Sequence, residues 1–231
     1  MRKLKFNNIS MYHVYNRGVE KRDIFLDKQD HYRFVHDLYE FNDTNPTPNI
    51  YYRTNQNKIK SYEAKPHKIK KRELLVEIYA FCLMPNHFHL FLKQLRDNGI
   101  STFLHKLGTG YSMYFNQKYK RNGSLFQGPF KAVWIEKEAH FIHLPYYIHL
   151  NPLSLIEPKW KQGKIKNFGK TVEFLETYRW SSYLDYTGKK NFPSIIQDKF
   201  LSEFFGSPQK HKKETLNWLK EINPENIIEL F

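Results

Sequence analysis

Two apolar segments on either side of a Pro-Asn pair constrain the fold of this chain most strongly. The first, LLVEIYAFCLM, spans residues 74–84, and the second, HFHLFLKQL, spans residues 87–95. Each has the length and the aliphatic and aromatic content of a buried strand, and Pro85-Asn86 is typical of a tight turn. We therefore predict two strands joined by a turn, as part of an antiparallel sheet.

The flanking segments predict helices around that sheet. A strand at 10–17 (SMYHVYNR) ends at Gly18, and Asp27 is a suitable N-cap for the helix that follows it. Further elements are predicted as helices at 99–120 and 137–150, a strand within 124–136 that bends at Gly128-Pro129, and a C-terminal helix near 210–222. This order favours an α+β fold, most simply a ferredoxin-like antiparallel sheet with helices on one face.

The domain organisation is predicted to be simple. Residues 1–186 form one domain, and residues 187–231 form a C-terminal extension. Within the domain, residues 42–72 change to Asn, Pro, Thr and Lys, with seven basic residues between Lys58 and Arg72. We interpret them as a basic insertion.

Composition points to a polyanionic partner. The chain has 37 Lys and Arg against 23 Asp and Glu, a formal charge of +14, and 17% aromatic residues. Basic side chains release counterions from phosphates, and exposed rings stack on unpaired bases, so single-stranded nucleic acid is one interpretation. A basic protein with an aromatic core is an equal alternative.

The same sequence argues against several classes of protein. No stretch has the uninterrupted apolar length of a membrane span, and the basic N-terminus MRKLKFNNIS is not followed by the apolar region of a secretory signal. Cys82 is the sole cysteine, which excludes an internal disulfide and a cysteine-rich zinc module. A cytoplasmic location is expected.

His87 and His89 are candidate metal ligands. Side chains alternate along a strand, so both imidazoles project to one side, about 7 Å apart. Two imidazoles in this arrangement can hold one divalent metal ion on a rigid element. Alternatively, they are hydrogen-bonded histidines that line a half-buried face.

Tyr147 and Asn151 are a second candidate pair, in the segment FIHLPYYIHLNP. A spacing of four residues places both on one face of a helix. A tyrosine beside a metal suits a phenolate nucleophile that attacks a phosphodiester, and the Asn151 carboxamide oxygen could be a third, hard ligand. Alternatively, Tyr146 and Tyr147 simply pack the helix onto the sheet.

Five ordered motifs carry a resemblance to a known family. They are YHVYNRGVEKRDIF, LMPNHFHLFL, SLFQGPFKAVWIE, YIHLNP and YRWSSY. Over roughly residues 10–186 the chain resembles the REP-associated tyrosine transposases, within the single-tyrosine HUH transposase superfamily of IS200-like transposases. The resemblance implies that His87 and His89 bind the metal, that Tyr147 is the nucleophile, and that Asn151 lies beside the metal.

The resemblance also implies a reaction and a substrate. Tyr147 would cleave single-stranded DNA near a hairpin or repeat, leaving a 5′-phosphotyrosine link and a free 3′-hydroxyl, with Mg²⁺ or Mn²⁺ as cofactor. A different 3′-hydroxyl would then reverse the step and join strands. This branch of the superfamily favours a monomer over a homodimer.

Two positions depart from the family pattern. Tyr146 stands where many relatives have a basic residue, so an assignment shifted by one residue stays open, although Tyr146 lies about 100° from the Asn151 face. Gly128-Pro129-Phe130 replaces a glycine, arginine, aromatic run, which removes one potential phosphate contact.

Two basic groups are candidate DNA contacts, and solvated surface charge is the alternative for each. The candidates are Arg17, Lys21 and Arg22 after the first strand, and Lys118, Lys120 and Arg121 at the end of a helix.

Two other classes of function remain open. One is a non-catalytic DNA-binding protein that retains the transposase fold. The other is a zinc-dependent hydrolase of small substrates, in which His13, His143 or His149 would supplement the histidine pair.

Overall fold

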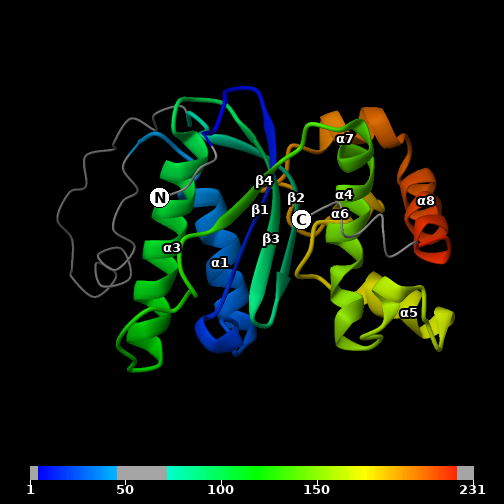
Figure 1. Cartoon of the computed structure of the whole chain (residues 1–231), viewed down its shortest axis with the longest axis horizontal. Coiled ribbons are helices and arrows are strands. Elements are labelled where there is room, and N and C mark those ends of the chain that lie inside the picture. Colours follow the sequence, from blue (N-terminus) through cyan, green and yellow to red (C-terminus); the bar gives the residue numbers. More distant parts are fainter. Residues whose placement is uncertain (1–4, 46–71, 223–231) are drawn as a thin grey trace, which may run out of the picture.

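The apolar segments around Pro85 form a hairpin within a four-stranded antiparallel sheet. A computed structural model describes residues 5–45 and 72–222 of the chain. The sheet has the order β2-β3-β1-β4 (Figure 1). Its strands are β1 (Met11–Arg17), β2 (Val76–Met84), β3 (His87–Gln94) and β4 (Lys131–Trp134).

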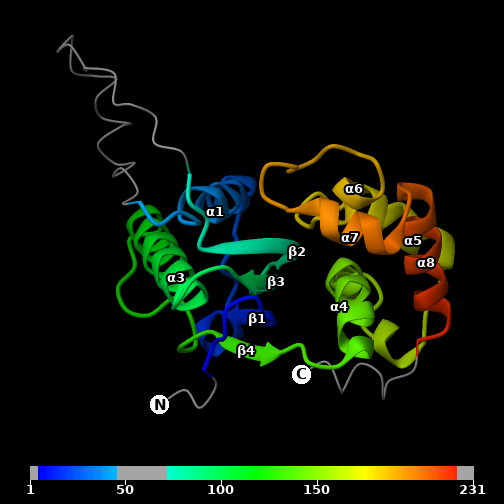
Figure 2. The ribbon, with the colours of Figure 1, turned by 90° about the horizontal axis from the view of Figure 1, so that it is seen from above.

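Helices cover both faces of this sheet. One face carries α1 (Lys28–Glu40) and α3 (Gly99–Lys118), and the other carries α4 (Glu138–Leu150) (Figure 2). Beyond α4 lie α5 (Phe168–Thr177), α6 (Tyr183–Tyr186), α7 (Asp198–Phe205) and α8 (Pro208–Lys220). The predicted α+β class and antiparallel sheet are confirmed.

The second helical layer goes beyond the prediction of helices on one face. Eight of the nine residues of β2 are buried, which is typical of a strand that is covered on both sides. Sequence periodicity shows that such a strand is buried but not what buries it. Here α4 supplies the second cover, and it thereby meets the sheet face to which His87 and His89 belong.

The outer edge of β2 is closed by the C-terminal part of the chain. Leu83 N–H donates to the Trp180 carbonyl, and Ser182 N–H donates to the Phe81 carbonyl. An exposed strand edge is a template for unwanted pairing, so this cover protects the sheet. The extension from residue 187 packs on the same layer, since the Phe205 ring lies 5.2 Å from that of Tyr146 in α4.

The predicted strands and helices are observed, but the helices between residue 151 and the C-terminal helix were missed. No helix was predicted between residues 151 and 209, yet α5, α6 and α7 lie there, and the N-cap of α5, Asn167, accepts a hydrogen bond from Lys170 N–H. Residues 46–71, most of the proposed basic insertion, lie outside the described residues. Among the helices that are described, none is long and apolar enough to cross a membrane.

A buried carboxylate joins α1 to α3. The side chain of Asp30 is fully buried and accepts hydrogen bonds from Lys118 Nζ at 2.7 Å and from the hydroxyls of Tyr114 and Tyr119 at 3.0 and 2.8 Å. It also accepts from Leu26 N–H at 2.8 Å. Burial alone would raise the pKa of Asp30, but these donors outweigh it and hold the pKa below its ordinary value.

We expect Asp30→Asn to destabilise the protein by about 3 kcal/mol, because it leaves the Lys118 ammonium without its buried partner. The lowered pKa means that the carboxylate contributes stability above its unfolded pKa, about 3.9, and that this contribution is lost as the pH falls through the folded pKa. Urea unfolding between pH 7 and pH 3 measures both effects. The control is Asp23→Asn, an exposed site; an equal loss in both variants would contradict the prediction.

Candidate active site

Three histidines lie together on the sheet face that α4 covers. His87 and His89 project from β3 with ring centroids 5.0 Å apart. In the neighbouring strand β1, Arg17 pairs with His87 and Tyr15 pairs with His89. The ring of His13, two residues before Tyr15, stacks 5.1 Å from that of His89, and His13 Nε2 lies 2.8 Å from His89 Nδ1. The strand register therefore adds His13 to the predicted pair.

Burial keeps the two candidate ligands neutral. It lowers the pKa of His87 to about 4, with the positive charges of Lys161 and Arg17 acting in the same direction and Asn151 opposing them. Burial also lowers the pKa of His89 well below its usual value. Neutral imidazole is the form that binds metal ions.

A hydrogen bond fixes the orientation of His87. Its Nδ1 lies 2.6 Å from Asn86 Oδ1, an acceptor, so Nδ1 carries the proton and Nε2 carries the lone pair. In this tautomer Nε2 is the atom able to bind a metal ion.

Tyr147 reaches the same place from α4. Its ring lies edge-on to His89 at 5.6 Å and to His13 at 6.2 Å. Asn151, at the C-cap of α4 one turn later, interacts with the Tyr147 hydroxyl and with His87. Burial raises the pKa of Tyr147, and the interaction with the Asn151 side chain partly offsets that rise in pKa. The structure thus brings together the two pairs that sequence spacing singled out.

The neighbouring tyrosine points elsewhere. The ring of Tyr146 lies 5.7 Å from that of His211 and 6.2 Å from that of Trp218, both in α8. It packs α4 against the extension, on the side away from the histidines. This geometry favours Tyr147 over an assignment shifted by one residue.

Lys161 is a site residue that sequence reasoning missed. Its Nζ donates a hydrogen bond to the Tyr147 hydroxyl at 2.8 Å and lies 4.6 Å from the centre of the phenol ring. Burial lowers the pKa of Lys161 to about 8. In a chain with 37 Lys and Arg, one more lysine carries no signal, so only the three-dimensional arrangement selects it.

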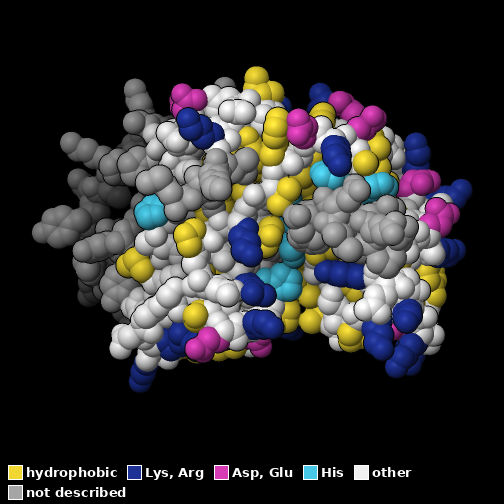
Figure 3. Space-filling view, in the orientation of Figure 1, with side chains coloured by type: hydrophobic (Ala, Val, Ile, Leu, Met, Phe, Trp, Pro, Cys, Tyr) yellow, Lys and Arg dark blue, Asp and Glu magenta, His cyan; other side chains and the backbone are white. Residues whose placement is uncertain are grey.

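A basic pocket opens in front of the histidines. Its volume is about 700 Å³, and its lining includes His87, His89, Arg17, Lys21 and Lys131. Figure 3 shows Lys and Arg side chains beside histidines near the middle of this face. Tyr147 is 1% exposed and lies beneath the histidines, so it does not line the pocket.

The six predicted DNA contacts separate into distinct environments. Arg17 and Lys21 line the basic pocket, and Arg17 Nε donates to Gln127 Oε1 at 2.5 Å. Arg22 pairs with Glu20 at 3.6 Å. Lys118 is bound to Asp27 and Asp30, each at 2.7 Å.

The last two predicted contacts lie beyond the C-terminal end of α3. Lys120 is exposed there, and Arg121 donates to Asn116 Oδ1 at 3.2 Å. Neither Lys120 nor Arg121 lines the basic pocket.

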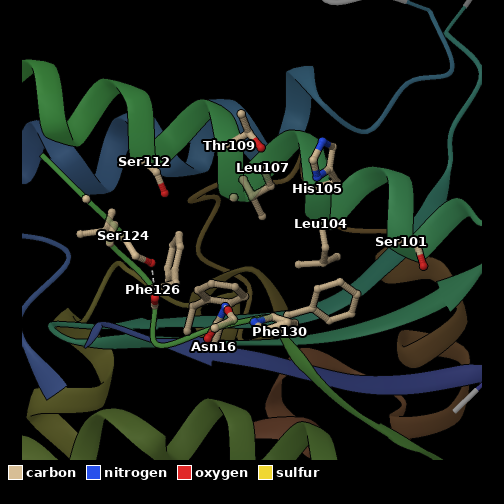
Figure 4. A pocket seen from close by; sticks show the side chains of 16 residues that line it. Asn16, Ser101, Leu104, His105, Leu107, Thr109, Ser112, Ser124, Phe126 and Phe130 are labelled. Atoms are coloured by element: carbon tan, nitrogen blue, oxygen red, sulfur yellow. Dashed lines mark hydrogen bonds between the residues drawn. The ribbon is translucent and has the colours of Figure 1, made fainter. Parts of the chain in front are cut away.

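A second cavity lies on the other side of the segment that precedes β4. Its volume is about 720 Å³, and Leu104, His105, Phe126 and Phe130 line it (Figure 4). Both cavities include Gly128 and Pro129 in their walls. The bend predicted at these two residues therefore separates the basic pocket from a largely apolar one.

The supplementary histidines of the zinc alternative lie apart from the pair, except His13. His143 Nδ1 accepts from Trp218 Nε1 at 2.8 Å, and His149 Nε2 lies 2.9 Å from Ser182 Oγ. Within residues 5–45 and 72–222, no group of three or more His, Cys, Asp or Glu side chains is arranged to hold a metal ion.

Comparison with known proteins supports the resemblance that the motifs predicted. The profile of the family described as "Transposase IS200 like" matches residues 51–151. The chain is similar to the IS200-like transposases. The matched range contains His87, His89, Tyr147 and Asn151, whereas His13 and Lys161 lie outside it.

The chain was also compared with solved structures and with curated proteins, and one solved structure is similar to it. The structure is described as that of the "REP associates tyrosine transposase bound to a REP hairpin". It is 14% identical, with a TM-score of 0.48, over 84% of this chain and 89% of that chain. Among curated proteins, none matches the sequence.

Proposed function

We propose that this chain is a transposase that cleaves and rejoins single-stranded DNA through a covalent link to Tyr147. The observation that carries the proposal is the meeting of His87 and His89 with Tyr147 and Asn151 beside a basic pocket. The match to IS200-like transposases over the same residues supports it. We further propose that the DNA carries a hairpin or repeat near the cleaved bond.

The donor set fits a divalent metal ion such as Mg²⁺ or Mn²⁺. Two neutral imidazoles and the carboxamide oxygen of Asn151 are the groups that would hold it. When bound, such an ion neutralises charge that builds on a phosphate. The carboxamide nitrogen of Asn151 is buried without a hydrogen-bond partner among the described residues, as expected of a side chain whose remaining partner arrives with a ligand.

The protein's own groups carry the remaining steps. Arg17, Lys21 and Lys131 attract the DNA backbone to the pocket. The Tyr147 oxygen forms a bond to phosphorus as the bond from phosphorus to the 3′-oxygen breaks, and the proton that the phenol gives up balances the proton that the 3′-oxygen takes up. A 3′-hydroxyl of another strand reverses the step and releases Tyr147.

A DNA-binding protein without catalysis is the second candidate. The observation in its favour is the 1% exposure of Tyr147, which keeps the phenol out of contact with the pocket in this conformation. The two candidates differ in whether a covalent adduct forms.

We expect wild-type protein to form a metal-dependent covalent adduct with single-stranded DNA that carries the repeats flanking its own gene. Tyr147→Phe removes the nucleophilic oxygen and should abolish the adduct. Tyr146→Phe is the matched control and should retain it, because Tyr146 faces α8. A denaturing gel with labelled DNA and Mn²⁺ is the measurement. Tight binding without an adduct would favour the second candidate.

We expect His13→Ala to weaken Mn²⁺ binding about 10–100-fold, as measured by calorimetry without DNA. The 2.8 Å hydrogen bond between His13 Nε2 and His89 Nδ1 holds the ring of His89, and a ligand that rotates freely binds more weakly. For His89 to bind the metal through Nε2, its Nδ1 must carry the proton and donate to His13. His143→Ala is the control, since His143 bonds Trp218 and not the pair. Equal affinities in all three proteins would refute the role of His13.

We expect Arg17→Ala to weaken DNA binding and to reduce the slope of log affinity against log salt by about 1, because one phosphate contact is lost. Lys118→Ala should leave this slope unchanged, since Asp27 and Asp30 already neutralise Lys118. Fluorescence anisotropy at several salt concentrations measures both slopes. A smaller slope in Lys118→Ala would show that the ion pairs open on binding.

A further inference from the structure

The segment that carries Lys161 is held in a defined conformation. Trp160 is fully buried, and its Nε1 donates to Ser154 Oγ at 2.9 Å. Gly163 ends the 3₁₀ turn Trp160–Gln162 with a φ of 70°, a backbone conformation that favours glycine. Glu157 accepts hydrogen bonds from the backbone that follows at residues 166 and 167. Lys161 therefore approaches Tyr147 from an anchored turn.

The position of the ammonium group is specific. It lies 2.8 Å from the oxygen that would attack phosphorus, on a partly buried side chain. Burial weakens solvation of the charge, and an opposite charge on the phenol oxygen compensates for that loss. A phenolate beside Lys161 is thus stabilised more than a phenol.

We propose that Lys161 is a catalytic residue that stabilises the phenolate form of Tyr147 through this hydrogen bond. The inference rests on the proposed function. In cleavage, the ammonium keeps its three protons and donates one hydrogen bond to the phenolate, which forms the bond to phosphorus as the 3′-oxygen leaves. In rejoining, the bond from Tyr147 to phosphorus breaks and the same donor stabilises the phenolate as leaving group.

A hydrogen bond from Lys161 that only restrains Tyr147 would have the opposite effect on the rate of adduct formation. If the hydrogen bond only held Tyr147 in a resting position, its removal would accelerate adduct formation. The direction of the rate change in variants of Lys161 therefore distinguishes a catalytic donor from a restraint.

The experiment uses chemical rescue of a lysine. Lys161→Met removes the donor, and Lys161→Cys allows alkylation with 2-bromoethylamine, which restores an ammonium at nearly the same distance. The sole native cysteine, Cys82, is buried and has a pKa that burial raises, so it resists alkylation. Lys159→Met and Lys159→Cys are matched controls at an exposed site two residues away.

Single-turnover rates of adduct formation and of adduct release by a 3′-hydroxyl strand are measured at saturating DNA and Mn²⁺. We expect Lys161→Met and untreated Lys161→Cys to slow both steps about 10²–10³-fold, the usual effect of losing one such donor. Because DNA and Mn²⁺ are saturating, changes in affinity for either do not enter these rates, and alkylation of Lys161→Cys should restore both rates. The Lys159 variants should behave as wild type throughout.

Several outcomes would overturn the inference. Rates that are unchanged or higher in Lys161→Met would overturn the role of Lys161 and leave the proposed function standing. The same holds for a folded Lys161→Cys whose rates alkylation does not restore. Wild-type protein that forms no adduct would overturn the proposed function and this inference with it.

Discussion

The antiparallel register between β1 and β3 is the constraint on which the site depends. Because side chains alternate along both strands, the pairing of Tyr15 with His89 and of Arg17 with His87 places all four on one face. A slip of one residue would turn His13 and its neighbours toward α1 and α3. The same register brings Arg17 from β1 into the pocket beside the histidines. This one backbone pairing thus sets the relative positions of the candidate metal ligands His87 and His89 and places the charge of Arg17 beside them.

The packing of α4 on this face then determines the electrostatics. Tyr147 and the histidines are excluded from water, so burial favours the neutral form of each. Neutral imidazoles are ready to bind a cation, but a neutral phenol is a poor nucleophile. In the proposed mechanism, Lys161 and Asn151 favour the phenolate form of Tyr147 and so counter this loss of nucleophilicity. Lys161 lies in the 3₁₀ turn Trp160–Gln162, and Asn151 is the C-cap of α4. In the proposed mechanism Lys161, which lies outside the matched range, thus joins Asn151, which lies within it, in offsetting the effect of burial on the phenol.

Periodicity explains why much of this was predictable. Two-residue spacing placed His87 and His89 on one face, and four-residue spacing placed Tyr147 near Asn151. The hydrogen bond of His13 depends on strand register, and that of Lys161 depends on a turn within residues 156–167, where no helical or strand period is present. The second helical layer was also missed, because the apolar sequence of a strand shows that it is buried but not which element packs on it. Local patterns predict local geometry, and these contacts are not local.

The depth of Tyr147 links the fold to the reaction. The basic pocket is the place where we propose that the DNA backbone binds, yet the phenol does not line it and has 1% of its surface exposed. The proposed covalent chemistry at Tyr147 therefore requires that side chains covering the phenol rearrange. Pro145 lies inside α4, two residues before Tyr147, where it removes one backbone hydrogen bond. The helix thus lacks one backbone hydrogen bond next to Tyr147, whereas the turn that carries Lys161 is anchored by Trp160. A rearrangement that exposes the phenol is compatible with the proposed role of Lys161 only where it leaves this part of α4 against the turn.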